Sequence, residues 1–129
     1  MKLLLDSNIV LPVVRREREK LSAHINFLLD AGSNDIFVSV ASLWEIAIKA
    51  RLGKLPLPAP VQDLPVMLSE FGYALIPVDV HHAIEELIDQ PDTRDPFDRM
   101  LLAQCQVEEM RLVTTDRSLA RHTLAWGNA

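Results

Sequence analysis

The sequence predicts an α/β fold, a three-layer sandwich with a mainly parallel central sheet of about four to five strands and helices on both faces. Short apolar runs rich in β-branched residues alternate with longer segments of helical periodicity. These runs are continuously apolar at their centres, as is typical of parallel strands covered on both faces. A chain of 129 residues, 49% of them hydrophobic, suits a single domain, residues 1–129, with one core.

The strands are expected where the apolar runs are short. The first directly precedes Asp6, and the second is apolar and β-branched at its centre. The expected set is 2–5, 36–39, 74–78, 112–114 and, at the edge of the sheet, 123–126.

The segments between these strands are expected to be helical. Gly32, Gly53 and Gly72 each follow such a segment and are predicted to end it. Asp79 is the expected N-cap of another. A proline-rich stretch, 55–60, is too short to separate two domains and is interpreted as a stiff internal connection. The expected helical segments run to about Ala31 and then cover 40–52, 63–71, 80–88, 96–110 and 118–121.

The charge balance limits how the protein can bind nucleic acid. The formal net charge is −5 and the pI about 5.3, which argues against binding through phosphate neutralisation by basic side chains. Aromatic residues make up 5%, too few for a stacking platform for single strands. The remaining possibility for a nucleic-acid enzyme is that metal ions supply the positive charge locally.

The N-terminal segment and the single cysteine predict a cytoplasmic protein. The first apolar stretch ends at Asp6, too early for a signal peptide, and charged residues interrupt the longer apolar run 38–50, so no membrane span is expected. Cys105 excludes an intrachain disulfide, and its apolar neighbours indicate a buried side chain in a reducing compartment.

Acidic residues follow the predicted strands. Asp6 comes directly after the first strand and Asp116 shortly after the fourth. Glu45 lies in the helix after the second strand, and Asp95 and Asp98 open the helix 96–110. Parallel strands end at the same rim of a sheet, so these carboxylates should converge there. Converging carboxylates repel one another, and a hard divalent cation, Mg²⁺ or Mn²⁺, relieves that repulsion. The expected chemistry is hydrolysis of a phosphodiester without a covalent intermediate.

Glu45 also has structural interpretations. Ser42 stands three residues earlier, as in a capping box, and Lys49 stands four later, as in an exposed helical ion pair. The wide apolar stripe of this helix favours a functional role.

The aspartates have such alternatives too. Asp95 precedes a proline and fits a helix N-cap, and Asp98 would then lie in the first turn, where the helix dipole favours it. Asp116 can cap the segment 118–121. Asp6 can cap a following helix, although an acid directly after a central apolar strand is otherwise costly.

Four segments resemble the motifs of PIN domains, in order and with suitable spacing. The opening motif is matched by an apolar strand followed by Asp and Ser. The second and third motifs are long and are very similar to those of VapC-type toxins. The matching segments are 3–8 (LLLDSN), 41–55, 94–104 (RDPFDRMLLAQ) and 112–116 (LVTTD).

This resemblance implies a PIN fold and a Mg²⁺- or Mn²⁺-dependent endoribonuclease acting on RNA, the toxin of a toxin–antitoxin pair. It implies a cognate antitoxin partner and a homodimer. The acidic metal-site and catalytic residues it implies are Asp6, Glu45, Asp98 and Asp116, with Asp95 ranked below them. The chain departs from many relatives by carrying Asn8 and Thr93 where they carry His, so no particular substrate is carried over.

Other functions stay open at this point. A non-catalytic PIN domain that binds RNA or protein is disfavoured because all four acids are present. A DNA-directed nuclease uses the same metal chemistry. A phosphatase of the haloacid dehalogenase type would need a second Asp at position 8, which is Asn8.

Basic, histidine and tryptophan residues have mixed interpretations. Mixed charges at 15–20 indicate a solvated helix end, with an RNA contact as the alternative. Arginines beside the acids either hold phosphate or pair with those acids. The histidines lack zinc-pair spacing and are expected at the surface. Trp44 and Trp126 are expected in the core or a dimer contact. The residues concerned are Arg15, Arg16, Arg18, Lys20, Arg94, Arg99, Arg117, His24, His81, His82 and His122.

Overall fold

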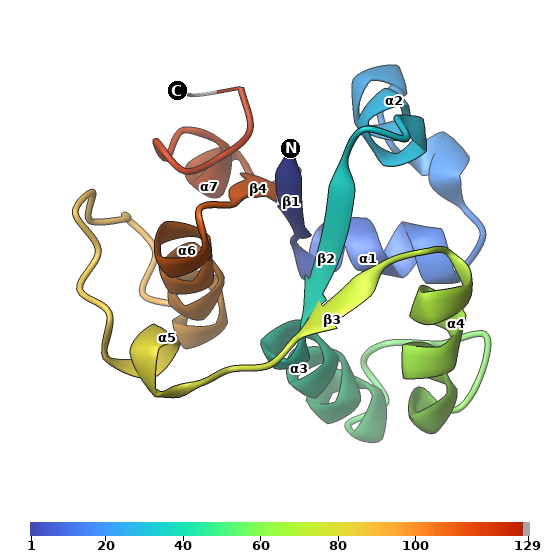
Figure 1. Ribbon diagram of the computed structural model, residues 1–129. Helices are drawn as coiled ribbons and strands as arrows, with labels where there is room; N and C mark the ends of the chain where they lie inside the picture. The colour runs from blue at the N-terminus through green and yellow to red at the C-terminus, as the bar shows by residue number, and fades with distance from the viewer. Residues whose placement is uncertain (128–129) are drawn as a thin grey trace.

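A computed structural model describes residues 1–127 and shows four strands with helices on either side (Figure 1). The strands are β1 (Lys2–Leu5), β2 (Asp35–Ser39), β3 (Ala74–Ile76) and β4 (Arg111–Val113). The helices are α1 (Ser7–Val14), α2 (Ala23–Asp30), α3 (Val40–Arg51), α4 (Leu64–Glu70), α5 (Val80–Ile84), α6 (Pro96–Glu108) and α7 (Arg117–Ala120), with short 3-10 turns η1 (Arg18–Lys20) and η2 (Val61–Asp63).

The sheet is parallel throughout, in the order β3-β2-β1-β4. The predicted α/β class is therefore confirmed, with four strands. The expected fifth strand at 123–126 was wrong, because this segment makes one isolated bridge, between Leu112 and Ala125. Its backbone turns too sharply to pair further: the N–H of Ala125 bonds back to the carbonyl of His122 at 3.0 Å.

The three layers follow from the side chains of β1, which point alternately to the two faces of the sheet. Leu3 and Leu5 point into one core cluster, which α1, α2 and α4 cover, while Leu4 points into a second cluster against α6 and α7. Figure 1 shows α1 and α4 on one side of the sheet and α6 on the other. Both faces are buried, which explains why the strands are apolar without alternation.

Some helices end at the predicted residues and others do not. Gly53 and Gly72 have φ values of +70° and +85° and end α3 and α4 as expected. Gly32 has no such role, because α2 already ends at Asp30 with an extended Ala31. Helix α5 is shorter than predicted, and 85–95 forms an irregular loop instead. Within residues 1–127, no helix is long and apolar enough to span a membrane.

The chain reverses its direction of progress across the sheet at β1. From β1 it moves outward through β2 to β3, and β4 then returns to the other side of β1. Open parallel sheets bind ligands at such a switch point, beyond the carboxyl ends of the two strands. Residues that follow β1 and β4 are therefore placed at the edge of the same crevice.

Candidate active site

A cavity of about 280 Å³ lies at this switch point. Five acidic side chains line it, together with the polar residues that follow β1, one lysine and three aliphatic side chains. The lining residues are Asp6, Ser7, Asn8, Leu11, Glu45, Ile46, Lys49, Leu55, Asp95, Asp98 and Asp116. All five acids predicted from the sequence are thus brought together.

Asp6 is the most buried of these acids, at 5% exposed. Its backbone N–H bonds to the carbonyl of Val113 at 2.9 Å, which extends the β1–β4 pairing by one step. It occupies the N-cap position of α1, yet its carboxylate caps no helical N–H. Instead Thr114 Oγ1 donates to Asp6 Oδ2 at 2.7 Å. Burial raises the pKa of Asp6 against the effect of that hydrogen bond, and the charges of Glu45 and Asp116 raise it further.

Asp98 lies in the first turn of α6 and faces the same cavity. Thr93 Oγ1 donates to Asp98 Oδ2 at 3.0 Å. Burial raises the pKa of Asp98 to about 6, although the Thr93 bond opposes this, and the charges of Asp95, Asp6 and Asp116 add to the rise. Burial is the main cause of both raised pKa values, and the charges of neighbouring carboxylates add to it.

Asp95 and Asp116 each line the cavity and cap a helix. Asp95 Oδ1 accepts from the backbone N–H of Phe97 at 2.9 Å at the start of α6. Asp116 Oδ1 accepts from the backbone N–H and hydroxyl of Ser118 at 2.9 and 2.7 Å at the start of α7. The bonds from Ser118 lower the pKa of Asp116. The predicted caps are therefore confirmed, and capping does not remove either residue from the site.

Glu45 reaches the cavity from α3 with its side chain 13% exposed. Ser7 Oγ donates to Oε1 at 2.7 Å, and Lys49 Nζ bonds to Oε2 at 3.1 Å. The expected ion pair with Lys49 is present. The capping-box interpretation was wrong: Ser39 caps α3, and Ser42 lies inside the helix, buried.

The donor set fits a hard divalent cation. The cavity offers carboxylate, hydroxyl and amide oxygens with no Cys or His in its lining. Within the described residues, however, no three of these acids bring donor atoms within 4.8 Å of one another. Opposite ligands of Mg²⁺ lie about 4.2 Å apart, so one or two carboxylates with several waters fit this spacing better than a closed protein cage.

Hydroxyl groups orient three of the acids that line the cavity. Thr114 bridges two acids, since it donates to Asp6 and accepts from the backbone N–H of Asp116 at 3.0 Å. Ser7 and Thr93 likewise donate hydrogen bonds to the carboxylates of Glu45 and Asp98. The available signal was a hydroxyl residue close in sequence to each strand end or helix start.

Two histidines were wrongly expected at the surface. His82 and His122 are 2% and 6% exposed. Asp79, His82 and Glu108 hold donor atoms within 4.8 Å of one another. Both ring nitrogens of His82 are engaged, Nδ1 by the backbone N–H of Asp79 at 3.1 Å and Nε2 by Glu108 at 2.7 Å. This group therefore caps α5 and links it to α6.

The basic residues near 15–20 bond largely within the chain. Arg15 donates to the Pro56 carbonyl, Arg18 to Asn26 and Asp30, and Lys20 to Glu17. Among residues 1–127, Arg94, Arg99 and Arg117 form no salt bridge with the site acids.

The tryptophans differ in their surroundings. Trp44 is 62% exposed and makes an edge contact with Phe97, so it lies outside the core. Trp126 packs partly against the core and against His24.

Comparison with known proteins identifies the fold and the family. The family model of the PIN domain matches residues 3–123. The chain belongs to the PIN-domain family. It is 46% identical over 50 residues to Ribonuclease VapC16 of Mycobacterium tuberculosis, a match that covers 38% of this chain and 36% of that protein. The chain is thus similar to a VapC ribonuclease over about a third of that protein's length.

A solved structure supports the same fold over nearly the whole chain. The crystal structure of VapBC2 from Rickettsia felis, bound to a DNA fragment from their promoter, superposes with a TM-score of 0.62. The match covers 97% of this chain and 96% of the other, at 17% identity. A PIN-like fold, a four-stranded parallel sheet between helices, is therefore confirmed.

Proposed function

We propose that this PIN-domain protein is a Mg²⁺- or Mn²⁺-dependent endoribonuclease that hydrolyses RNA phosphodiester bonds. The observation that carries the proposal is the cavity at the β1/β4 switch point, in which five carboxylates converge. Asp6, Glu45, Asp98 and Asp116 are the proposed metal-site and catalytic residues, with Asp95 beside them. Similarity to a VapC ribonuclease supports RNA as the substrate.

The proposed chemistry assigns separate work to the ion and to the side chains. A bound cation would supply a Lewis acid and lower the pKa of a water ligand. Asp6 and Asp98 would hold the cation, because positive charge offsets the burial and the neighbouring carboxylates that raise their pKa values. Thr114 and Ser7 fix the orientation of Asp6 and Glu45. Lys49 lines the cavity and offers an ammonium group to an RNA phosphate.

We further propose that the protein is the toxin of a toxin–antitoxin pair that acts in the cytoplasm and is held by a cognate antitoxin. Similarity to Ribonuclease VapC16 and to the VapBC2 structure supports this. The expected result is slowed growth when the chain is expressed alone and recovery when the antitoxin is supplied. Normal growth at a high level of active protein would contradict it.

A homodimer is the oligomeric state we propose. An almost wholly apolar hollow of about 560 Å³ between α3 and α6 supports it, with Trp44, Phe97 and Met100 in its lining. Sedimentation analysis over a range of concentrations tests this, and a monomer at all of them would contradict it.

The decisive experiment is cleavage of a mixed RNA pool by the purified chain with Mg²⁺ or Mn²⁺ and with EDTA. Glu45→Gln removes one charge from the cavity, and Glu70→Gln removes one from an exposed position on α4 as the matched control. Cleavage should need metal, survive in Glu70→Gln and disappear in Glu45→Gln. Equal cleavage by both variants would remove Glu45 from the site. Single-stranded DNA of matched sequence, if cut equally well, would indicate a nuclease without RNA preference.

A further inference from the structure

The irregular loop 85–95 leads directly into the site. It contains no helix or strand after α5, and its last residues precede α6, which carries Asp98. A loop of this length loses considerable conformational entropy when it is ordered, so it needs specific contacts to hold it. Those contacts come from two elements, α6 and the segment that follows α7.

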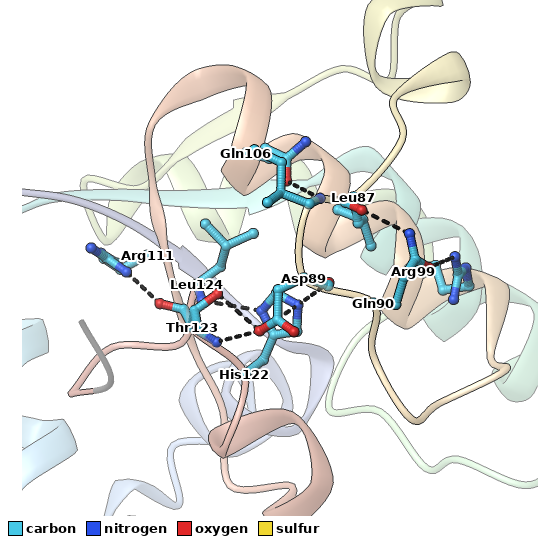
Figure 2. Close-up of polar contacts among 10 residues, drawn as sticks. Leu87, Asp89, Gln90, Arg99, Gln106, Arg111, His122, Thr123 and Leu124 are labelled. Atoms are coloured by element: carbon cyan, nitrogen blue, oxygen red, sulfur yellow. Dashed lines mark hydrogen bonds and ion pairs between the residues drawn. The ribbon is translucent and has the colours of Figure 1, made fainter.

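The segment after α7 holds the loop at Asp89 (Figure 2). Asp89 Oδ2 accepts from the backbone N–H of Thr123 at 3.2 Å and from Thr123 Oγ1 at 2.9 Å. His122 Nε2 donates to the carbonyl of Asp89 at 2.7 Å, because its Nδ1 accepts from Leu124 at 3.1 Å. We call Asp89, His122 and Thr123 the Asp89 anchor.

Helix α6 holds the loop on either side of that anchor (Figure 2). Arg99 Nη2 donates to Gln90 Oε1 at 3.0 Å. Gln106 Oε1 accepts from the backbone N–H of Ile88 at 3.0 Å. The loop is therefore fixed against the same helix whose first turn enters the cavity.

Thr93 is where this loop meets the cavity acids. Its hydroxyl accepts from the backbone N–H of Asp95 at 3.1 Å and donates to Asp98 Oδ2 at 3.0 Å. The accepted bond directs the hydroxyl proton toward Asp98. The backbone of Asp98 is fixed by α6, so the orientation of its carboxylate is the remaining freedom, and the Thr93 bond removes it.

We propose that Thr93 is a positioning residue that orients the Asp98 carboxylate toward the metal, and that the Asp89 anchor holds Thr93 in place from outside the cavity. This rests on the proposed metal-dependent function. A residue that only capped α6 would affect stability and leave metal affinity unchanged, which makes the two roles separable.

The test is Mn²⁺ titration of the full chain by calorimetry, without RNA, with urea unfolding of each variant as a check on folding. Thr93→Val, which removes the hydroxyl at nearly constant shape, should weaken Mn²⁺ binding about tenfold, and Thr93→Ala should do the same. Thr93→Ser keeps the hydroxyl and should restore affinity to within about twofold of wild type. Ser69→Ala, at an exposed position on α4, is the control for loss of a hydroxyl elsewhere.

The anchor is tested by a double-mutant cycle. The single variant Asp89→Ala should bind Mn²⁺ about threefold more weakly than wild type. The double variant with Asp89→Ala and Thr93→Val should bind Mn²⁺ no more weakly than Thr93→Val alone. Wild-type affinity in folded Thr93→Val would overturn the proposal, and additive losses would overturn the role of the anchor.

Parallel RNA cleavage separates this proposal from the proposed function. If the wild-type protein binds Mn²⁺ but does not cut RNA, the proposed nuclease function is overturned. The positioning role of Thr93 is still supported in that case if Thr93→Val binds Mn²⁺ more weakly than wild type. A wild type that binds no Mn²⁺ overturns both.

Discussion

Replacing Asp98 by Asn should stabilise the metal-free protein while destroying its metal site. Folding raises the pKa of this carboxyl from its ordinary value of 3.8 to about 6. A rise of about two pH units corresponds to at most about 3 kcal/mol. Asp98 is only half-buried, so solvent screening reduces this to about 1–2 kcal/mol. Asn keeps an oxygen that can accept from Thr93 and removes the ionisation cost.

The sign of the pH dependence follows from proton binding. Between pH 3.8 and about 6 the folded protein holds a proton on Asp98 that the unfolded chain has lost. The contribution of Asp98 to stability is therefore fully present below pH 3.8 and is lost as the pH rises through about 6. The advantage of the Asn variant should be largest near pH 7.5 and fall to about a third of that near pH 4.5.

Urea unfolding in EDTA, followed by tryptophan fluorescence at several pH values, measures this advantage. Thermal unfolding in EDTA near pH 7.5 should give Asp98→Asn a melting temperature about 3–6 °C above that of wild type. Saturating Mn²⁺ should stabilise the wild type and leave the variant unchanged. A variant less stable than wild type in EDTA at that pH, or an advantage independent of pH, would refute the argument that ionising the half-buried Asp98 carboxyl costs stability.

Three further outcomes are expected. Asp6→Asn should lower metal-dependent cleavage by more than about a hundredfold without loss of folding, because the buried oxygen that accepts from Thr114 is kept; full cleavage by the folded variant would remove Asp6 from the site. Lys49→Met should change the free energy of unfolding by less than about 1 kcal/mol, since the Lys49 side chain of the ion pair is half exposed and Ser7 still bonds to Glu45. The same variant should raise KM for RNA, and an unchanged KM would count against a phosphate contact. Burial raises the pKa of Cys105, so native protein should resist a thiol reagent that reacts fully in urea, and rapid native labelling would show that the second core cluster opens.

The close spacing of helix caps and catalytic candidates explains why single acids were ambiguous in the sequence. Asp95 and Asp116 carry local signals for capping and also line the cavity. One carboxylate has two oxygens, and capping uses only one of them. The two interpretations of Asp95 and Asp116, as helix caps and as residues that line the site, are therefore compatible. The spacing of residues in the sequence could not show this.

Local chemistry determined what the sequence predicted correctly. Continuous apolar runs, the glycines that end α3 and α4, and the Asp79 cap of α5 depend on residues a few positions apart. The rim position of Asp6 and Asp116 followed from the rule that parallel strands end together. The segment 123–126 was wrongly predicted to be an edge strand because its apolar residues pack against the core although the backbone there forms a turn.

Tertiary structure alone decided which groups touch. Thr114 lies 108 residues from Asp6, and Asp89 lies 34 from Thr123, so neither bond has a signature in the spacing of the sequence. The burial of His82 and His122 likewise depends on elements that pack over them. The sequence by itself determined most of the elements, the fold class and the acids that line the cavity, because these arise from local periodicity and residue type. The orientation of Asp6, Glu45 and Asp98 was decided only by packing. The hydroxyls that bond to these three carboxylates are brought close by the fold or by an irregular loop.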